Sequence, residues 1–266
     1  MQKDVHFYLT YLLCVRIGVS RKNAEKIAWA DQYTDELTES KVYSIQTQSD
    51  EFGSWEDEQI QHSVLVPFHF IPGSNEEHPW LTEANSDTVQ ALIKAASADL
   101  FQLGISLHGL QDSFSHQGFS GWREPVNSCY PWYYIKSALP NVGHAELLAV
   151  PDVINYVWTD PRSGERIDNK VRGIQAASAT FDSLAEIFNP NIDPDVWKVL
   201  RTELESIFKI DCYDDRKQAL RDLADKPKLR YSILYKKFQE DYENDFISAA
   251  RNHLSVAIKL FEDLPL

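Results

Sequence analysis

Cysteine is scarce in this chain of 266 residues, which contains Cys14, Cys129 and Cys212. Three widely separated thiols neither staple a domain of this length nor match the paired spacing of a zinc finger. The apolar run 7–15 is flanked by charged or polar residues and lacks the small residue that a signal-peptide cleavage site needs. No apolar run approaches the roughly 18 residues of a membrane-spanning helix. We therefore expect a cytoplasmic protein without a membrane span.

Basic residues are also in the minority. The chain has 26 Lys and Arg but 40 Asp and Glu, so its formal net charge is -14. A protein that grips nucleic acid through its phosphates needs the opposite sign, so extended nucleic-acid binding is not expected. Bound divalent cations would cancel several of those negative charges locally. The content of apolar residues, 43%, is sufficient for one large core, although two smaller domains remain an alternative.

Helical periodicity dominates the chain, and the patterns cover about 4–17, 21–37, 85–117, 169–188, 194–209, 213–224 and 229–262. Asp4 and Ser20 stand in capping positions, and Gly18 ends the first pattern. The stretches 38–84 and 118–168 are irregular, apart from a strand-like run at 63–70. We predict an all-α protein of one helical domain, 1–266, with long irregular loops that carry a metal cluster. The metal-site region is expected at about 1–155 and a C-terminal helical scaffold at about 169–266.

The most informative spacing is that of His108, Asp112 and His116 in the most apolar predicted helix. Residues four apart differ by about 40° around a helix axis, so the three side chains share one face. A carboxylate buried between two imidazoles is costly unless something pairs with it. A hydrogen-bonded core network would satisfy the three groups, and so would a metal cation, for which imidazole and carboxylate ligands favour zinc or iron.

Further histidines and acids stand where predicted helices and loops begin or end, and each one alone is weak support for a site. Asp31 and Asp35 lie four apart at the end of the second predicted helix. The remaining candidates are Asp4, His6, His69, His144, Glu146 and Asp152. The number and order of these residues along the chain favour a fold in which their side chains meet around bound cations.

Several short motifs give this pattern a family likeness. They are Gln32-x-x-Asp35, Pro67-Phe-His-Phe70, His108-x-x-x-Asp112, His116-Gln-Gly-Phe-Ser-Gly121 and Gly143-His-Ala145. The order of ligands resembles the zinc-dependent phospholipase C and single-strand nuclease superfamily, over about residues 1–155. It also resembles a group of bacterial proteins of unknown function with the same pattern. The resemblance implies a mostly helical fold that binds three zinc ions in one cleft.

Carried over by position, the resemblance assigns one zinc to Asp35, His69, His108 and Asp112. A second would be held by His116, His144 and an acid, either Asp152 or Glu146. A third would be held by His6 and the amine and carbonyl of Met1, with Asp112 bridging and Asp4 as an alternative ligand. The superfamily has an acid four residues after the second-site histidine, but Leu148 occupies that position here.

The expected activity is therefore that of a metal-dependent phosphoester hydrolase, phosphodiesterase- or phospholipase C-like, acting on a small phosphoester. Two or three zinc ions, or else iron or manganese, would activate water, with Asp35 and Asp112 as the catalytic carboxylates. Trp122 and Arg123 are the candidates for substrate contact. The alternatives are a di-iron or other oxidative enzyme on a helical scaffold, and a non-catalytic helical binding protein stabilised by metal.

Overall fold

The computed structural model describes residues 1–38, 45–48, 55–129, 140–262 and 264 of the chain. Within them helices are the main secondary structure, as predicted from the periodicity of the sequence, and irregular segments separate them. The part up to residue 147 contains η1 (Asp4–Leu9), α1 (Thr10–Ile17), α2 (Arg21–Tyr33), α3 (Glu58–Ile60), η2 (Gln61–His69), α4 (Asp87–Ala96), α5 (Leu100–Ser115), η3 (Pro125–Asn127) and η4 (Ala145–Leu147). The remainder contains β1 (Val157–Thr159), β2 (Arg166–Asp168), α6 (Asn169–Phe188), α7 (Pro194–Ile207), α8 (Tyr213–Leu223) and α9 (Tyr231–Phe261).

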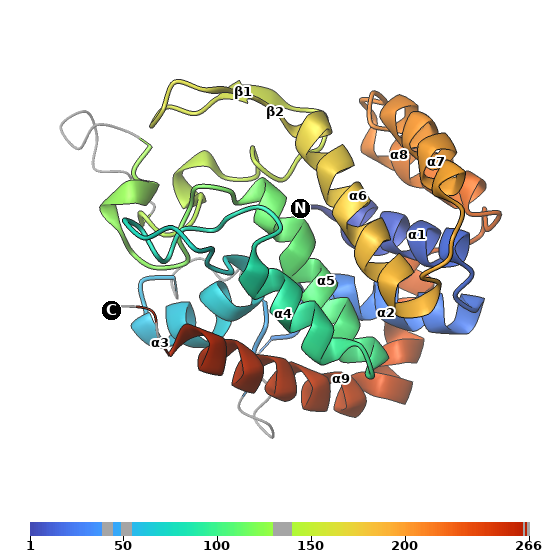
Figure 1. Ribbon diagram of the computed structural model, residues 1–266, viewed down its shortest axis with the longest axis horizontal. Coiled ribbons are helices and arrows are strands. Elements are labelled where there is room, and N and C mark those ends of the chain that lie inside the picture. Colours follow the sequence, from blue (N-terminus) through green and yellow to red (C-terminus); the bar gives the residue numbers. More distant parts are fainter. Residues whose placement is uncertain (39–44, 49–54, 130–139, 263, 265–266) are drawn as a thin grey trace.

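Helix α5 lies at the centre of the arrangement, in contact with α2, α4, α6, α9 and η2 (Figure 1). All of its residues from 101 to 115 are buried. The N-terminus lies beside α5 in the middle of the view, and α9 runs along one side of the molecule. Among the described residues, no helix has the length and apolar content that crossing a membrane requires.

The predicted helix over 85–117 is wrong in one respect, because the structure divides it into α4 and α5. Ser86 caps α4, and its side-chain oxygen accepts a hydrogen bond from the backbone N–H of Val89. Asp99 then starts a new helix, since its carboxylate accepts from the N–H groups of Phe101 and Gln102, at 2.8 and 3.0 Å. A carboxylate that caps orphan N–H groups competes with helix continuation, so the chain turns at 97–99.

The strand-like interpretation of 63–70 is also wrong, because this run belongs to the π-helix η2, with Pro67 inside it. Val64, Leu65, Val66, Phe68 and His69 are all buried there. A continuous apolar run carries no periodicity when both of its sides are covered, so strand and helix cannot be distinguished from the pattern. The short hairpin of β1 and β2 is an addition that the sequence pattern did not indicate.

The first helical pattern begins in π geometry as η1 and continues as α1 to Gly18, whose φ of 100° ends it as expected. Ser20 caps α2, as predicted. Asp4 does not act as a cap, because it lies in the first turn and accepts a hydrogen bond from Nε of Arg216 at 2.9 Å. This buried ion pair joins η1 to α8.

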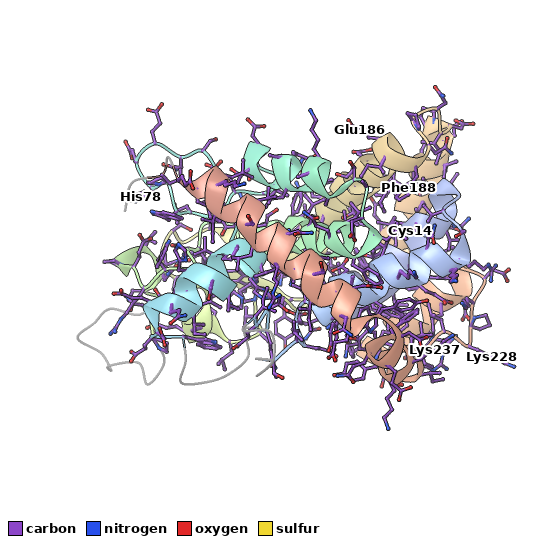
Figure 2. All side chains as sticks on the ribbon, turned by 90° about the horizontal axis from the view of Figure 1, so that it is seen from below. Cys14, His78, Glu186, Phe188, Lys228 and Lys237 are labelled. Atoms are coloured by element: carbon purple, nitrogen blue, oxygen red, sulfur yellow. The ribbon has the colours of Figure 1, made fainter. Side chains whose placement is uncertain are left out.

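Of the C-terminal helices, α6 and α9 pack directly against the central helix α5. Helix α9 crosses one face of the molecule diagonally, with Lys237 directed outwards near one end (Figure 2). Its inward face includes His253, which is fully buried and stacks on Phe68 of η2. The arrangement places η2 and α5, which carry candidate ligands, against a continuous helical support.

Candidate metal centre

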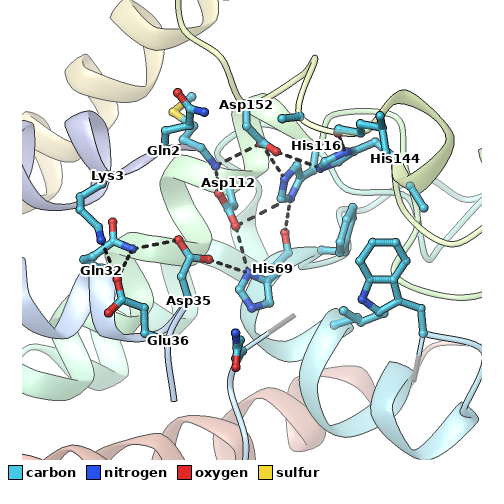
Figure 3. A pocket seen from close by; sticks show the side chains of 18 of the residues that line it. Gln2, Lys3, Gln32, Asp35, Glu36, His69, Asp112, His116, His144 and Asp152 are labelled. Carbon is cyan, nitrogen blue, oxygen red and sulfur yellow. Dashed lines mark hydrogen bonds and ion pairs between the residues drawn. The ribbon is translucent and has the colours of Figure 1, made fainter. Parts of the chain in front are cut away.

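A cavity of about 690 Å³ opens beside α5, and most of the candidate ligands form one of its walls (Figure 3). Met1, Asp35, His69, Asp112 and His116 line this polar wall. The lining also includes apolar residues, namely Trp55, Leu65, Phe70, Val142, Ala145, Leu148 and Ala149. The cavity therefore joins a charged surface to a nonpolar one.

Asp112 lies at the centre of the polar groups. Its Oδ1 contacts the α-amine of Met1 and lies 3.3 Å from Nε2 of His6. Its Oδ2 lies 3.2 Å from Nδ1 of His69 and 3.2 Å from Nε2 of His108. One carboxylate thus faces the N-terminal amine and imidazoles from η1, η2 and its own helix α5, which is the position that a bridging ligand would occupy.

A first group of possible ligands consists of Asp35, His69 and His108. Asp35 follows the end of α2, and its Oδ1 lies 3.5 Å from His108 Nε2 and 3.9 Å from His69 Nδ1. His69 comes from the end of η2 and His108 from the middle of α5. Three separate segments therefore converge within ligating distance of one point.

A second group consists of His116, His144 and Asp152. The two oxygens of Asp152 divide between the imidazoles, with 3.2 Å from Oδ1 to His116 Nε2 and 3.3 Å from Oδ2 to His144 Nε2. Asp152 also lies 3.2 Å from the Met1 amine, so this group adjoins Asp112. Of the two acids left open by the sequence, the structure brings Asp152 to this group.

A third group, His6, Asp31 and His108, is fully buried beneath the cavity wall. The rings of His6 and His108 stack with centroids 4.1 Å apart. Asp31 lies on the far side of both rings, 3.0 Å from His6 Nδ1 and 3.4 Å from His108 Nδ1. The Nε2 atoms of the two rings face Asp112 instead.

Backbone carbonyls orient the remaining imidazoles. His69 Nε2 donates to the carbonyl of Thr47 at 2.7 Å, and His116 Nδ1 donates to that of His69 at 2.7 Å. His144 Nδ1 donates to the carbonyl of Leu148 at 2.8 Å. In each ring the other nitrogen faces a carboxylate. Metal-binding histidines usually show this arrangement.

The electrostatics of the cluster are those of cations and carboxylates buried together. Burial disfavours the charged amine of Met1, but Asp112, Asp152 and Asp35 outweigh it and raise the amine's pKa to about 11. Burial alone would raise the pKa of Asp112, yet the amine, His116 and His108 hold it well below its usual value. The pKa of Asp152 is likewise lowered, against burial, by the amine and His144.

The pKa values of His108 and His144 shift in opposite directions. Burial lowers the pKa of His108, but Asp112 and Asp35 reverse the effect and raise it well above its usual value. For His144, burial prevails over Asp152 and lowers the pKa, which keeps the ring neutral and able to bind a metal. In the absence of cations, protons on the Met1 amine and on His108 therefore supply part of the positive charge beside the carboxylates.

Four predicted site residues lie apart from these groups. Asp4 pairs with Arg216, and the side chain of Glu146 accepts the backbone N–H of Cys129 at 2.7 Å. Trp122 packs edge-on against Trp80, and Arg123 forms an exposed ion pair with Glu56 at 3.5 Å. Trp122 and Arg123 line a different, smaller cavity of about 340 Å³. The structure therefore does not place them where a substrate on the polar wall would lie.

Sequence reasoning missed two features of the site. Asp31 was singled out by its spacing from Asp35 but was given no part in the site, although it contacts two candidate ligand rings. Trp122 was the aromatic residue expected at the substrate, but the apolar part of the cavity does not include it. This part is built instead by residues such as Trp55 and Leu148, and only the tertiary contacts indicate them.

The donor set fits divalent zinc. It combines imidazole nitrogens with carboxylate oxygens, and Nε2 of His6 is buried without a hydrogen-bond partner among the described residues. An unpaired buried nitrogen is costly, and a cation beside Asp112 would satisfy it. His6, His69, His108, His116 and His144 would hold the metal together with Asp35, Asp112 and Asp152.

A family model described as "Family of unknown function (DUF6765)" matches residues 1–261. No curated protein and no solved structure matches the chain.

Proposed function

We propose that this chain, which belongs to the family of unknown function DUF6765, is a metal-dependent hydrolase of phosphate esters. The observation that carries the proposal is the convergence of three groups of His and Asp ligands on Asp112, beside an open cavity. Structural metal sites are closed by protein ligands, whereas a catalytic site keeps a position that water or substrate can reach.

The order of the ligands along the chain supports the same activity, because it resembles the zinc-dependent phospholipase C and single-strand nuclease superfamily. The geometry is compatible with the ligand sets that this resemblance implies. Asp112 adjoins the amine, His6, His69 and His108, while Asp152 joins His116 to His144. Two or three zinc ions are the proposed cofactor.

When bound, zinc would supply positive charge for phosphoryl oxygens and lower the pKa of a coordinated water. The residues of the chain contribute position and electrostatics. Asp112, held by an amine and several imidazoles, keeps the groups at fixed separations. Asp152 keeps its negative charge because its pKa is lowered, so it stays available as a ligand. The phosphoryl end of a substrate would lie against this wall.

The apolar residues of the lining indicate which esters fit. Leu65, Phe70, Val142 and Leu148 offer a nonpolar surface in the same cavity as the ligands, and this cavity is large enough for a small organic molecule. Burying a nonpolar substituent there would contribute about 25 cal/mol per Å². We therefore propose a phosphoester of an apolar or aromatic alcohol as the substrate class.

The direct test measures metal and turnover in the same preparation. The purified protein is expected to contain zinc by elemental analysis and to release p-nitrophenol from bis(p-nitrophenyl) phosphate. A chelator should abolish release and added zinc should restore it. Asp112→Asn should lose both metal and turnover, while Asp160→Asn, which changes a buried carboxylate bonded to Arg162, should keep both. Full metal occupancy without turnover on a panel of phosphoesters would refute the proposal.

A further inference from the structure

A closed ring of hydrogen bonds lies behind the cavity wall. The hydroxyl of Thr10 donates to Asp31 Oδ2 at 2.6 Å, and Gln111 Nε2 donates to Thr10 Oγ1 at 2.7 Å. His6 Nδ1 lies 2.9 Å from Gln111 Oε1 and 3.0 Å from Asp31 Oδ1. All four residues are buried, with exposed fractions of 0%.

The donors and acceptors of this ring leave one consistent assignment. The Thr10 hydroxyl donates its only hydrogen to the Asp31 carboxylate, so its oxygen accepts a hydrogen bond from the amide nitrogen of Gln111. The amide oxygen of Gln111 then faces His6, and both groups that face Nδ1 are acceptors. Nδ1 of His6 must therefore carry a hydrogen, so the neutral ring that binds a metal has its lone pair on Nε2.

The other side of the His6 ring is directed toward the proposed metal position at Asp112. Its Nε2 is buried and has no hydrogen-bond partner within the described ranges, and it faces Asp112 Oδ1 at 3.3 Å. The stacked ring of His108 has the same orientation, with Nδ1 toward Asp31 and Nε2 toward Asp112. The contact from His108 to Asp31, at 3.4 Å, is long for a hydrogen bond, so the assignment depends mainly on His6.

We propose that Asp31 is a positioning residue: with Thr10 and Gln111 it holds His6 with a hydrogen on Nδ1, so that Nε2 binds metal. The inference rests on the metal centre proposed above. It assigns Asp31 the part of an orienting carboxylate, although His6, Asp31 and His108 lie close enough to suggest an ion between them. The hydrogen bonds explain why no ion is needed there, since they already occupy both oxygens of Asp31 and Nδ1 of His6. Carboxylates that orient ligand histidines commonly affect metal affinity by 10–100-fold, a range of roughly one to two orders of magnitude.

The test compares metal affinity among matched variants. Metal-free protein is titrated with zinc against a competing chelator. A parallel titration with cadmium-113, which replaces zinc, follows each bound ion separately by NMR. Asp31→Asn should weaken the ion served by His6 by roughly 10–100-fold. The ion held by His116, His144 and Asp152 should change by less than about threefold. The control Asp160→Asn should leave all ions unchanged. Thr10→Val, which removes only the hydroxyl, should weaken the same ion by a smaller factor.

A spectroscopic measurement keeps the inference testable if a variant fails to fold. Nitrogen-15 shifts of the zinc-loaded wild-type protein should show a hydrogen on His6 Nδ1 and metal on Nε2. Metal on Nδ1, an ion ligated by Asp31, or equal affinity in wild type and Asp31→Asn would overturn the inference while leaving the hydrolase proposal intact. Failure of the wild-type protein to bind zinc would overturn both.

Discussion

His116 and Asp152, 36 positions apart in the chain, meet with 3.2 Å between Nε2 and Oδ1. One residue ends the central helix, and the other lies in a turn after η4. This contact selects Asp152 over Glu146 as the acid beside the second pair of histidines. The relationship leads to the first of four predictions.

Replacing Asp152 by Asn is expected to remove one metal ion per chain, because it takes the charge from the carboxylate shared by His116 and His144. Glu146→Gln is the matched control, since Glu146 contacts the backbone of Cys129 and no candidate ligand. Elemental analysis of both purified variants measures the difference. Equal metal content in the two variants would contradict the assignment of Asp152.

A methyl group at Gly104 is expected to force α5 away from α2. A Cβ there would lie 2.5 Å from the carbonyl oxygen of Ile27 and 2.7 Å from Cβ of Ala30. Backbone cannot move aside cheaply, so Gly104→Ala should lower the free energy of unfolding by about 2 kcal/mol. On the same helix, Gly109→Ala meets the flexible end of Ile71 and should cost less than about 1 kcal/mol. Urea denaturation of the two variants distinguishes these values, and a larger loss for Gly109→Ala would contradict the packing argument.

His253 is expected to make the fold sensitive to acid. Burial lowers its pKa to about 4, while its ring bonds to Ser106 and to the carbonyl of Pro67. Between this value and its ordinary pKa of about 6.5, the unfolded chain binds more protons, so stability falls as the pH falls through this window. The loss from this group between pH 7 and 5 should be about 2 kcal/mol.

The measurement for His253 is urea denaturation at pH 7 and pH 5, for the wild type and for His253→Gln. Glutamine retains a donor for the carbonyl of Pro67 but does not titrate. The stability difference between the two proteins should therefore shift in favour of the variant at pH 5. A difference that does not change with pH would show that His253 does not contribute to acid sensitivity.

Leu148 combines a backbone role with an apolar side chain at the cavity. Its φ of 54° is unfavourable for leucine, and its side chain is 57% exposed. Leu148→Gly should keep the carbonyl that orients His144, and therefore the metal content. The melting temperature should not fall, because relief of strain offsets the greater freedom of glycine in the unfolded chain.

If the proposed activity holds, Leu148→Gly should raise KM for an aryl phosphodiester by roughly tenfold, through lost apolar contact. Leu260→Ala is the control, because Leu260 is an exposed leucine of α9 that does not line the cavity. Kinetics of both variants at full zinc occupancy provide the measurement. An unchanged KM would show that the Leu148 side chain does not contact the substrate.

Local patterns gave reliable predictions where the physical cause is local. The face shared by His108 and Asp112 follows from helix periodicity alone, and the structure indeed has them 3.2 Å apart. The cap by Ser20 and the end at Gly18 likewise depend on neighbouring residues. The break at Asp99 was missed because a polar residue on an apolar helix is compatible with either continuation or capping.

The sequence by itself determined the helical class and the residue types able to bind a metal, because periodicity and side-chain chemistry are properties of short segments. Only the tertiary structure decided that Asp152 contacts His144, that Arg216 forms an ion pair with Asp4, and that Asp31 contacts the rings of His6 and His108. These outcomes depend on contacts between segments far apart in the chain, which packing brings together and which no local pattern encodes.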